Sequence, residues 1–209
     1  PANITSIGTY AFTGCSGMTN LVFNSGFTTI STYAFYSCTG LTSVCIPSSV
    51  TSIGISAFES CTGLKSITIP GSVTSIGNYA FYNCFGLYFV LFKGNAPTAG
   101  GSSVFRNSRA TIYYLPNVSG WSSTFGGSLT LCWNPSIQSG ASFGFASGSF
   151  GFNIAGTTNI PVVVQATTNL ISGTWTPLTN ATLGISGSLT VRDPASGGLP
   201  SRFYRVAFP

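Results

Sequence analysis

The sequence predicts a mainly β protein, a solenoid of 23-residue coils followed by a small antiparallel β-sandwich. Cys15, Cys38, Cys61 and Cys84 stand 23 residues apart, and the residues around them repeat with the same period. A period of about 20 to 29 residues is typical of solenoids in which each coil buries its apolar face against the next. The second observation is that the repeat stops near Pro135, where short β-rich runs separated by Gly, Ser, Thr and Asn begin.

Each coil is predicted to contain one short strand. In LKSITIP, apolar and polar residues alternate, so Leu64, Ile67 and Ile69 are expected to point inward. Pro70 ends the strand, because proline lacks the N–H that a central ladder needs. Gly63 supplies a permissive backbone just before the strand. Strands of successive coils would stack in parallel about 4.8 Å apart, which aligns equivalent side chains into ladders.

The segment before Gly63 is predicted to contain a short helical turn, because Ala57, Phe58 and Cys61 have the spacing i, i+1, i+4. Packing is the preferred role of these side chains, since a buried free cysteine behaves as a small hydrophobe. Disulfides between coils and a zinc site are the alternatives. Both are disfavoured, because ladder side chains project the same way and four sulfurs in a row do not make a tetrahedron. The predicted structural ladder comprises Phe12, Phe35, Phe58, Phe81, Cys15, Cys38, Cys61 and Cys84.

After Leu87 the repeat degrades, and the chain from about residue 93 to residue 135 is predicted to cap the apolar face of the last coil. Within this cap, TIYYLP at 111–116 is predicted to form one more strand. Trp121 and Trp133 are expected to add large buried surfaces.

The repeated pattern AFxxCxGLxxVxIPxSVTSIG is similar to the BspA-like leucine-rich repeats of bacterial surface and secreted proteins, over about residues 1–135. This resemblance implies a curved, right-handed solenoid and a role in adhesion or surface display. It also implies a secreted or cell-surface location and no catalytic residues.

Residues 136–209 are predicted to form the β-sandwich, because several short strands with turn signals between them are typical of that fold. VVVQATTNLISGTWTPL, together with RFYRV near the C-terminus, resembles small C-terminal β-sandwich modules of secreted proteins from environmental bacteria. The candidate strands are 141–145, 149–155, 161–167, 174–178, 188–193 and 202–208.

The charge inventory argues against an enzyme. The 209 residues include two acidic residues, seven basic residues and no histidine. A glycosidase usually needs two carboxylates within about 10 Å of each other, but Glu59 and Asp193 lie in different predicted domains. A serine or cysteine nucleophile usually needs a nearby base, and Lys65 and Lys93 have nothing in the pattern to position them. We therefore predict no catalytic residue, no metal site and no cofactor.

Nucleic acids and membranes are also disfavoured as partners. The basic residues are scattered and form no run of the kind that contacts many phosphates. No stretch approaches the 18 or so consecutive apolar residues of a membrane span.

Three sequons fit an extracellular chain, although such triplets also arise by chance. The possible glycosylation sites are Asn3, Asn117 and Asn180.

Tyrosines recur on the side of the coils that carries the Ala-Phe pairs. Tyr10, Tyr33 and Tyr79 precede these pairs, and Tyr36 and Tyr82 follow them. This aromatic stripe could stack on sugar rings or on a protein partner. The preferred interpretation is packing at the rim of the coils, because amphipathic tyrosines are often half buried.

The two ends of the chain suggest a contact between subunits. Residues 1–18 supply only the second half of a coil, so the first full strand is expected to have an open edge, which the last strand of a neighbouring copy could cover. The candidate interface residues are Ile4, Ile7, Leu21, Phe23, Phe203, Tyr204, Val206 and Phe208.

Two functions remain open. The preferred one is a non-catalytic extracellular structural protein, a homo-oligomer or filament subunit built by head-to-tail contacts. The alternative is a monomeric adhesin or binding module for a glycan or for a host or cell-surface protein.

Overall fold

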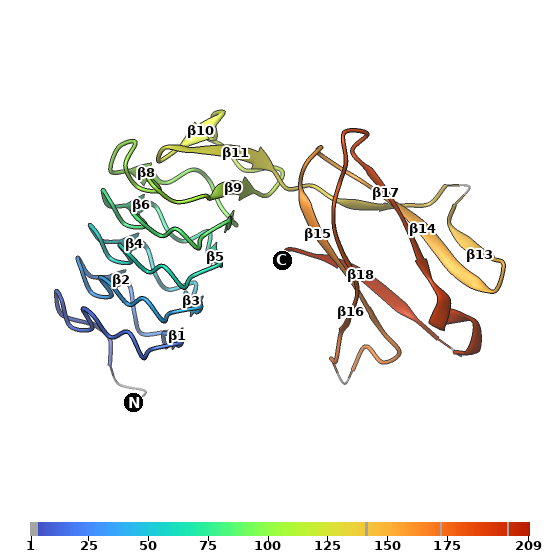
Figure 1. The fold of residues 1–209 in the computed structure, drawn as a ribbon, viewed down its shortest axis with the longest axis horizontal. Coiled ribbons are helices and arrows are strands. Elements are labelled where there is room, and N and C mark those ends of the chain that lie inside the picture. The colour runs from blue at the N-terminus through green and yellow to red at the C-terminus, as the bar shows by residue number, and fades with distance from the viewer. Residues whose placement is uncertain (1–3, 141, 172, 200) are drawn as a thin grey trace. The chain divides into compact units, whose positions relative to one another are not determined.

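A computed structural model describes residues 4–140, 142–171, 173–199 and 201–209 of the chain. The protein divides into two compact units, the first ending at Cys132 and the second beginning at Trp133 (Figure 1). Each unit has its own buried core.

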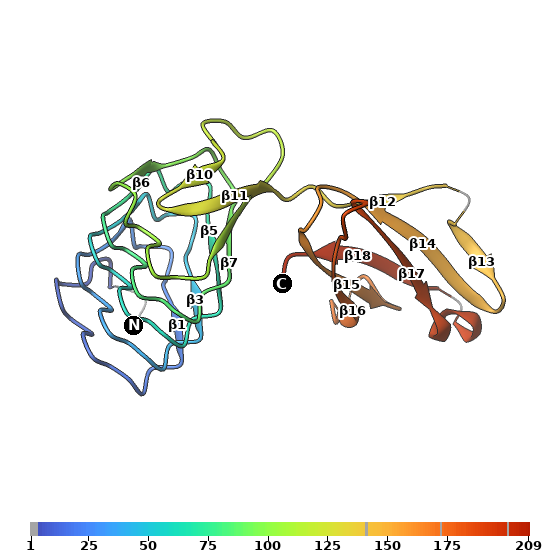
Figure 2. The same ribbon diagram turned by 45° about the horizontal axis from the view of Figure 1, so that its top comes forward.

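The first unit is a stack of coils joined by a parallel ladder of strands, and partners are 23 residues apart, as in the Leu21–Val44 and Ile67–Val90 pairs. Figure 2 shows this ladder along one side of the coils. Among the described residues, this ladder consists of two separately hydrogen-bonded sheets. One contains β1 and β3, and the other contains β5, β7, β9 and β11. The strands are β1 (Asn20–Val22), β3 (Ser43–Cys45), β5 (Ser66–Ile69), β7 (Phe89–Phe92), β9 (Thr111–Tyr114) and β11 (Ser128–Cys132).

A second parallel ladder runs through the coils and was not predicted. Its strands pair in the order β2–β4–β6–β8. Each has only two residues, too few to show an alternation in the sequence. They are β2 (Thr29–Ile30), β4 (Ser52–Ile53), β6 (Ser75–Ile76) and β8 (Thr98–Ala99).

The predicted short helical turn is wrong, because this segment is a run of turns. The N–H of Phe58 donates to Ala80 O of the next coil at 2.9 Å, whereas the N–H of Cys61 donates to Phe58 O of its own coil at 3.2 Å. An α-helix instead bonds each N–H to the carbonyl four residues back. Ser56 and Ser60 also have positive φ angles of 51° and 61°, which interrupt any helical path.

Gly40, Gly63 and Gly86 stand before their strands at points where the coils approach closely. Gly63 does not have a positive φ angle, so its backbone freedom is not what the position requires. A Cβ on Gly63 would lie 2.6 Å from Thr39 O of the previous coil, and a Cβ on Gly86 would lie 2.2 Å from Thr62 O. Only glycine lets the coils stack at this distance.

A phenylalanine ladder fills the centre of the solenoid. The stacked rings of Phe35 and Phe58 have centroids 5.4 Å apart, and the same distance separates Phe58 from Phe81. Phe105 continues the ladder at 5.2 Å from Phe81 even though the sequence places it one residue out of register. Phe12 begins the ladder, stacked on Phe35 at 5.4 Å.

The cysteine ladder lies beside these rings, and all its thiols are free. Cys38, Cys61 and Cys84 are buried, while Cys15 is half buried. Each buried thiol donates to the phenylalanine carbonyl of the preceding coil, as Cys61 does to Phe35 O at 3.3 Å. The thiol therefore satisfies a backbone acceptor as well as filling space.

The cap closes the last coil with aromatic rings. Strand β10 (Thr124–Phe125) pairs antiparallel with β11. Trp121 stacks on Tyr114 at 5.1 Å, contacts Phe92 edge-on at 4.9 Å and donates to Gly94 O at 3.2 Å. Trp133, expected in this cap, instead lies in the second unit, where it donates to Pro161 O at 2.8 Å.

The second unit consists of two antiparallel sheets, of four and three strands. Figure 2 shows both groups of strands. Three predicted strands, 149–155, 161–167 and 188–193, match the observed bounds. The first sheet contains β12 (Ser136–Gln138), β13 (Gly144–Ala146), β14 (Ser149–Ala155) and β17 (Ser188–Asp193), and the second contains β15 (Pro161–Thr167), β16 (Thr176–Thr182) and β18 (Phe203–Ala207).

Burial of the thiols predicts that stability falls in alkali. Burial raises the pKa of Cys38 and Cys61, and it raises that of Cys84 to about 12, against an ordinary value of 9.0. Above pH 9 the unfolded chain loses these protons while the folded chain keeps them. The free energy of unfolding should therefore decrease as the pH rises above about 9, by up to about 1.4 kcal/mol per pH unit for each thiol that is still protonated in the folded chain, and for Cys84 up to about pH 12.

Urea unfolding at pH 7.5, 9.5 and 10.5 measures this effect. A variant with Cys38→Ser, Cys61→Ser and Cys84→Ser keeps a donor at each position but has no thiol to titrate, so its alkaline slope should be shallower. Equal slopes in the two proteins would contradict the prediction.

Candidate functional site

The turns of the first unit present a row of hydrophobic side chains, here called the turn-edge surface, made of Tyr10, Tyr33, Tyr36, Ile55, Tyr79 and Tyr82. Tyr10, Ile55 and Tyr79 are exposed, and the other three are half buried. Tyr10, Tyr33 and Tyr79 all have positive φ angles, of 63°, 55° and 60°. This backbone conformation is uncommon for a bulky residue. Its recurrence shows that the position is set by the hydrogen-bonded turns rather than by tyrosine's own preference.

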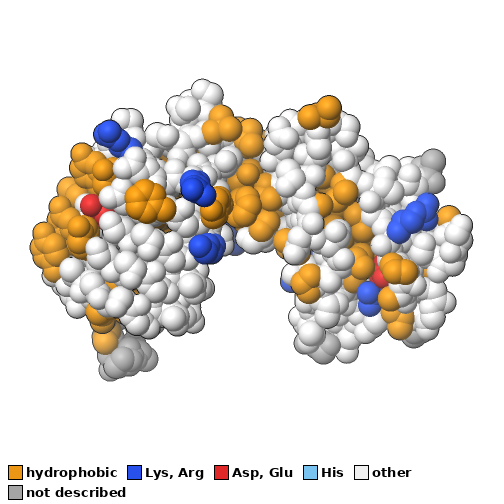
Figure 3. Space-filling model, in the orientation of Figure 1, with side chains coloured by type: hydrophobic (Ala, Val, Ile, Leu, Met, Phe, Trp, Pro, Cys, Tyr) orange, Lys and Arg blue, Asp and Glu red, His pale blue; other side chains and the backbone are white. Residues whose placement is uncertain are grey.

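The tyrosines form two similar pairs on alternate coils. Tyr33 and Tyr36 meet edge-on with ring centroids 5.9 Å apart, and Tyr79 and Tyr82 do so at 5.3 Å. Tyr10 stacks on Tyr33 at 4.6 Å. Figure 3 shows hydrophobic side chains gathered along this edge of the first unit, with an acidic side chain among them.

The coil between the two pairs carries Ser56 and Glu59 where its neighbours carry tyrosine. Ser56 is 1% exposed, and its Oγ has no hydrogen-bond partner among the described residues. Glu59 is half buried, and no partner of its carboxylate is found in the described part of the chain. Its negative charge is close enough to contribute, after burial, to the raised pKa of Cys84.

Amide side chains border the second tyrosine pair. Asn107 donates to Asn83 Oδ1 at 2.9 Å and to the Tyr82 hydroxyl at 3.3 Å. These contacts connect Tyr82 to the following coil and orient its hydroxyl.

The candidate interface residues at the first coil lie around one groove. Ile4, Ile7, Leu21 and Phe23 line this groove, of about 370 Å³, together with Phe12. Ile4 is exposed and Phe23 is buried, while Ile7 and Leu21 are half buried.

The candidate interface residues of the last strand point in different directions. Tyr204 stacks on Phe150 at 5.4 Å, and Phe208 contacts Trp133 edge-on at 5.6 Å. Val206 is half buried. Phe203 is exposed and lines a cavity of about 450 Å³ in the second unit.

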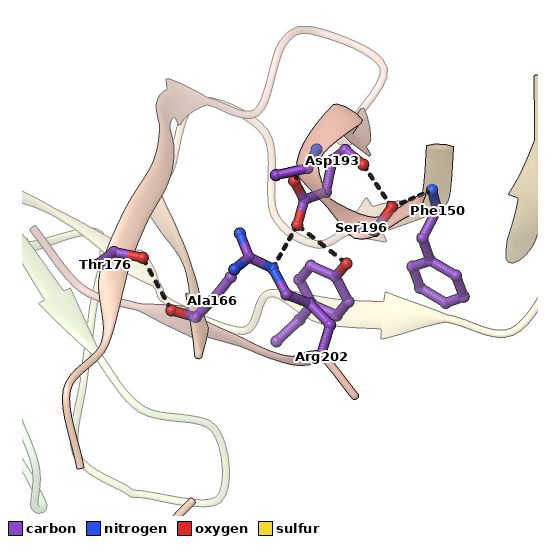
Figure 4. A network of polar contacts seen from close by, with 8 residues as sticks. Phe150, Ala166, Thr176, Asp193, Ser196 and Arg202 are labelled. Atoms are coloured by element: carbon purple, nitrogen blue, oxygen red, sulfur yellow. Dashed lines mark hydrogen bonds and ion pairs between the residues drawn. The ribbon is translucent and has the colours of Figure 1, made fainter. Parts of the chain in front are cut away.

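A buried carboxylate organises the second unit. Asp193 is fully buried, and its Oδ2 accepts from Arg202 Nε at 2.7 Å and from the Tyr204 hydroxyl at 3.1 Å (Figure 4). Its Oδ1 accepts from the N–H of Ala195 at 3.0 Å, at the start of the 3₁₀ helix η1 (Pro194–Gly198). Burial and the negative charge of Asp193 raise the pKa of Tyr204. With all its contacts internal, Asp193 holds β17, η1 and β18 together.

Within either unit, the described residues include no pair of side-chain carboxylates. The two acidic side chains belong to different units, and Asp193 is committed to its internal contacts. Within the described ranges, no group of three or more His, Cys, Asp and Glu residues could hold a metal ion. The described helix is also too short to cross a membrane, and no other candidate span is found in those ranges.

Two of the sequons lie on exposed backbone. Asn117 is in a turn, and Asn180 is in β16 opposite Val163. Asn3 lies outside the described residues.

Comparisons with known proteins agree with this geometry. A family model described as "BspA type Leucine rich repeat region (6 copies)" matches residues 1–111. No match is found among curated proteins.

Two solved structures are similar to the chain. A leucine-rich repeat protein from Bacteroides ovatus ATCC 8483 is 26% identical with a TM-score of 0.50, covering 63% of this chain and 35% of its own. A leucine-rich repeat protein of T. pallidum is 28% identical with a TM-score of 0.51, covering 54% of this chain and 56% of its own. The chain therefore matches only about a third and about half of the lengths of these two proteins.

The Asp193 contacts predict a large effect of one substitution on the second unit. Asp193→Ala leaves Arg202, only 18% exposed, without its partner. Breaking a buried pair from one side typically costs about 3–5 kcal/mol. Urea denaturation followed by the fluorescence of Trp133 and Trp175 measures the loss.

Arg192→Ala is the matched control for this change. Arg192 is exposed on the same strand, so its removal should change the free energy of unfolding by no more than about 0.5 kcal/mol. Similar losses in both variants would show that Asp193 does not organise the unit.

Proposed function

Because this chain belongs to the BspA-type leucine-rich repeat family, whose members are generally surface or binding modules, we propose that it is a non-catalytic extracellular binding module. It acts at the cell surface or after secretion, and its turn-edge surface contacts the partner. One observation carries this proposal: the turn-edge surface is partly exposed, and one coil keeps its core buried without tyrosines of its own at these positions.

The coil of Ser56 supports that observation directly. Ala57, Phe58 and Cys61 are fully buried, although Ser56 and Glu59 stand where other coils have tyrosines. The core of this coil is therefore buried without a tyrosine of its own at either position. This result favours an interaction surface over the rim packing that the sequence alone makes the simpler interpretation.

Exposure of three of the six residues of the turn-edge surface supports the same conclusion. Tyr10 is 55% exposed, Ile55 46% and Tyr79 38%. Contiguous exposed apolar side chains typically mark interaction sites. Tyrosine suits such a site, because it offers a large contact area, a polar hydroxyl and few rotatable bonds.

We infer that the second unit is a small β-sandwich module that accompanies the solenoid. Phe150 and Phe152 of β14 pack on Tyr204 of β18, so side chains of one sheet contact the other. The Asp193 contacts also join strands of the two sheets.

Assembly into a homo-oligomer or filament is the second candidate function. It is favoured by the apolar groove at Ile4, Ile7 and Leu21, and by Val22 on strand β1, which is 67% exposed. The low charge of the chain, seven basic and two acidic residues, also reduces repulsion between copies. A preceding coil of the same kind would cover this face equally well, so the binding role comes first.

The binding proposal predicts that two tyrosines are needed for recognition but not for folding. Tyr33→Ser with Tyr79→Ser should abolish retention on immobilised polysaccharides or extracellular-matrix proteins that retain the unmodified chain. Thermal unfolding should be nearly unchanged, since serine already stands at the equivalent position 56. Tyr88→Ser, outside the turn-edge surface, is the control for general loss of aromatic surface. Undiminished retention of the double variant would rule out this surface as the contact.

The assembly proposal predicts concentration-dependent self-association through the edge of β1. Val22→Lys should shift sedimentation velocity profiles to the monomer, because a lysine on an edge strand opposes further strand pairing. Val22→Thr retains β propensity and should associate as before. If the unmodified chain sediments as a monomer at all accessible concentrations, the assembly role is excluded for this chain.

A further inference from the structure

We propose that the coil of Ser56 and Glu59, flanked by the two tyrosine pairs, is a subsite for one sugar ring of an extended neutral polysaccharide. This inference rests on the proposed function, because it names the ligand class of the same turn-edge surface. Three features carry it: a missing tyrosine, two polar groups without partners, and the spacing of the aromatic pairs.

The missing tyrosine leaves one position of the row without a ring. Tyr10 and Tyr33, on adjacent coils, stack at 4.6 Å, so the coil spacing itself equals a ring-stacking distance. Ser56 follows Tyr33 in this row with the same left-handed backbone, at a φ angle of 51°. Tyr79 comes one coil later. A ring placed over Ser56 would therefore have an aromatic neighbour on each side.

Polar groups at this coil lack the partners that a buried site requires. The Ser56 hydroxyl is buried and without a hydrogen bond in the described structure, which is costly unless another molecule supplies the partner. The Glu59 carboxylate, three residues later, is half buried and also unpaired among the described residues. A sugar offers hydroxyl groups at its edge for both, and apolar C–H faces for the tyrosines.

The period of the surface fits a periodic ligand. The Tyr33–Tyr36 and Tyr79–Tyr82 pairs are two coils apart, about 10 Å at about 4.8 Å per coil. In an extended polysaccharide whose rings alternate in orientation, every second ring presents the same face. The two pairs can therefore stack on alternate rings while the ring between them occupies the Ser56 coil.

The charge of this coil favours a neutral glycan over an acidic one, and the basic residue of the same column, Arg106, lies two coils away. The carboxylate of Glu59 would repel uronate or sulfate groups, and the neighbouring Asn83 and Asn107 are neutral donors and acceptors. Because Ser56 is only 1% exposed, neighbouring side chains close over it and must turn aside when a ligand enters. Rotations of exposed side chains are fast enough to allow this.

The experiment uses the full chain and three defined probes in isothermal titration calorimetry: hexasaccharides of β-1,4-linked glucose, β-1,4-linked N-acetylglucosamine and α-1,4-linked glucose. At least one β-linked hexasaccharide should bind. Ser56→Tyr fills the position with the residue that three other coils carry, so it should fold normally and weaken binding at least about tenfold. Glu59→Gln should weaken binding several-fold.

The outcomes separate this inference from the proposed function. If no hexasaccharide binds at millimolar concentration while a protein partner is lost in the Tyr33→Ser, Tyr79→Ser variant, the surface is a protein interface and the sugar subsite is overturned. If a hexasaccharide binds and Ser56→Tyr binds equally well, the subsite is likewise overturned, although the surface remains the contact. If the double tyrosine variant also keeps full binding, the proposed function fails as well.

Discussion

The stacking of coils at the spacing of backbone hydrogen bonds is the constraint on which the first unit depends. Along each run of turns, alternate N–H groups donate to the next coil and the intervening ones bond within their own coil. In both ladders, the strands of neighbouring coils pair in parallel. Because neighbouring coils are this close, a single Cβ at Gly63 or Gly86 would collide with a carbonyl oxygen.

This constraint fixes what each coil position can do. Inward positions become continuous columns, so the Phe58 ring stacks on both of its neighbours and the Cys61 thiol reaches the Phe35 carbonyl. Outward positions repeat in the same way but are free to vary. At Ser56 the column changes residue type while the core beneath stays sealed. The residue type at this turn position can therefore change without exposing the core of its coil.

The second unit follows a different principle. Its strands are antiparallel and do not repeat, and its two sheets are joined by one buried carboxylate rather than by columns of identical residues. One carboxylate oxygen of Asp193 accepts hydrogen bonds from Arg202 and Tyr204, and the other accepts one from the N–H of Ala195. The nearby arginines Arg192 and Arg205 do not bind Asp193, and the sequence spacing of the three arginines does not reveal which of them pairs with it.

The period of the sequence by itself determined the solenoid, its register and the inward columns, because a 23-residue repeat with alternating apolar positions has few other ways to bury its side chains. It also indicated where tyrosines recur. Only the tertiary structure decided that the turns are not helical, that two-residue strands form a second ladder, and that Phe105 rejoins the column after a one-residue insertion. The same holds for the buried, unpaired hydroxyl of Ser56. Each of these features depends on hydrogen bonds and contacts with a neighbouring coil. The partner residues lie about 23 positions away in the chain, so the local sequence does not reveal them.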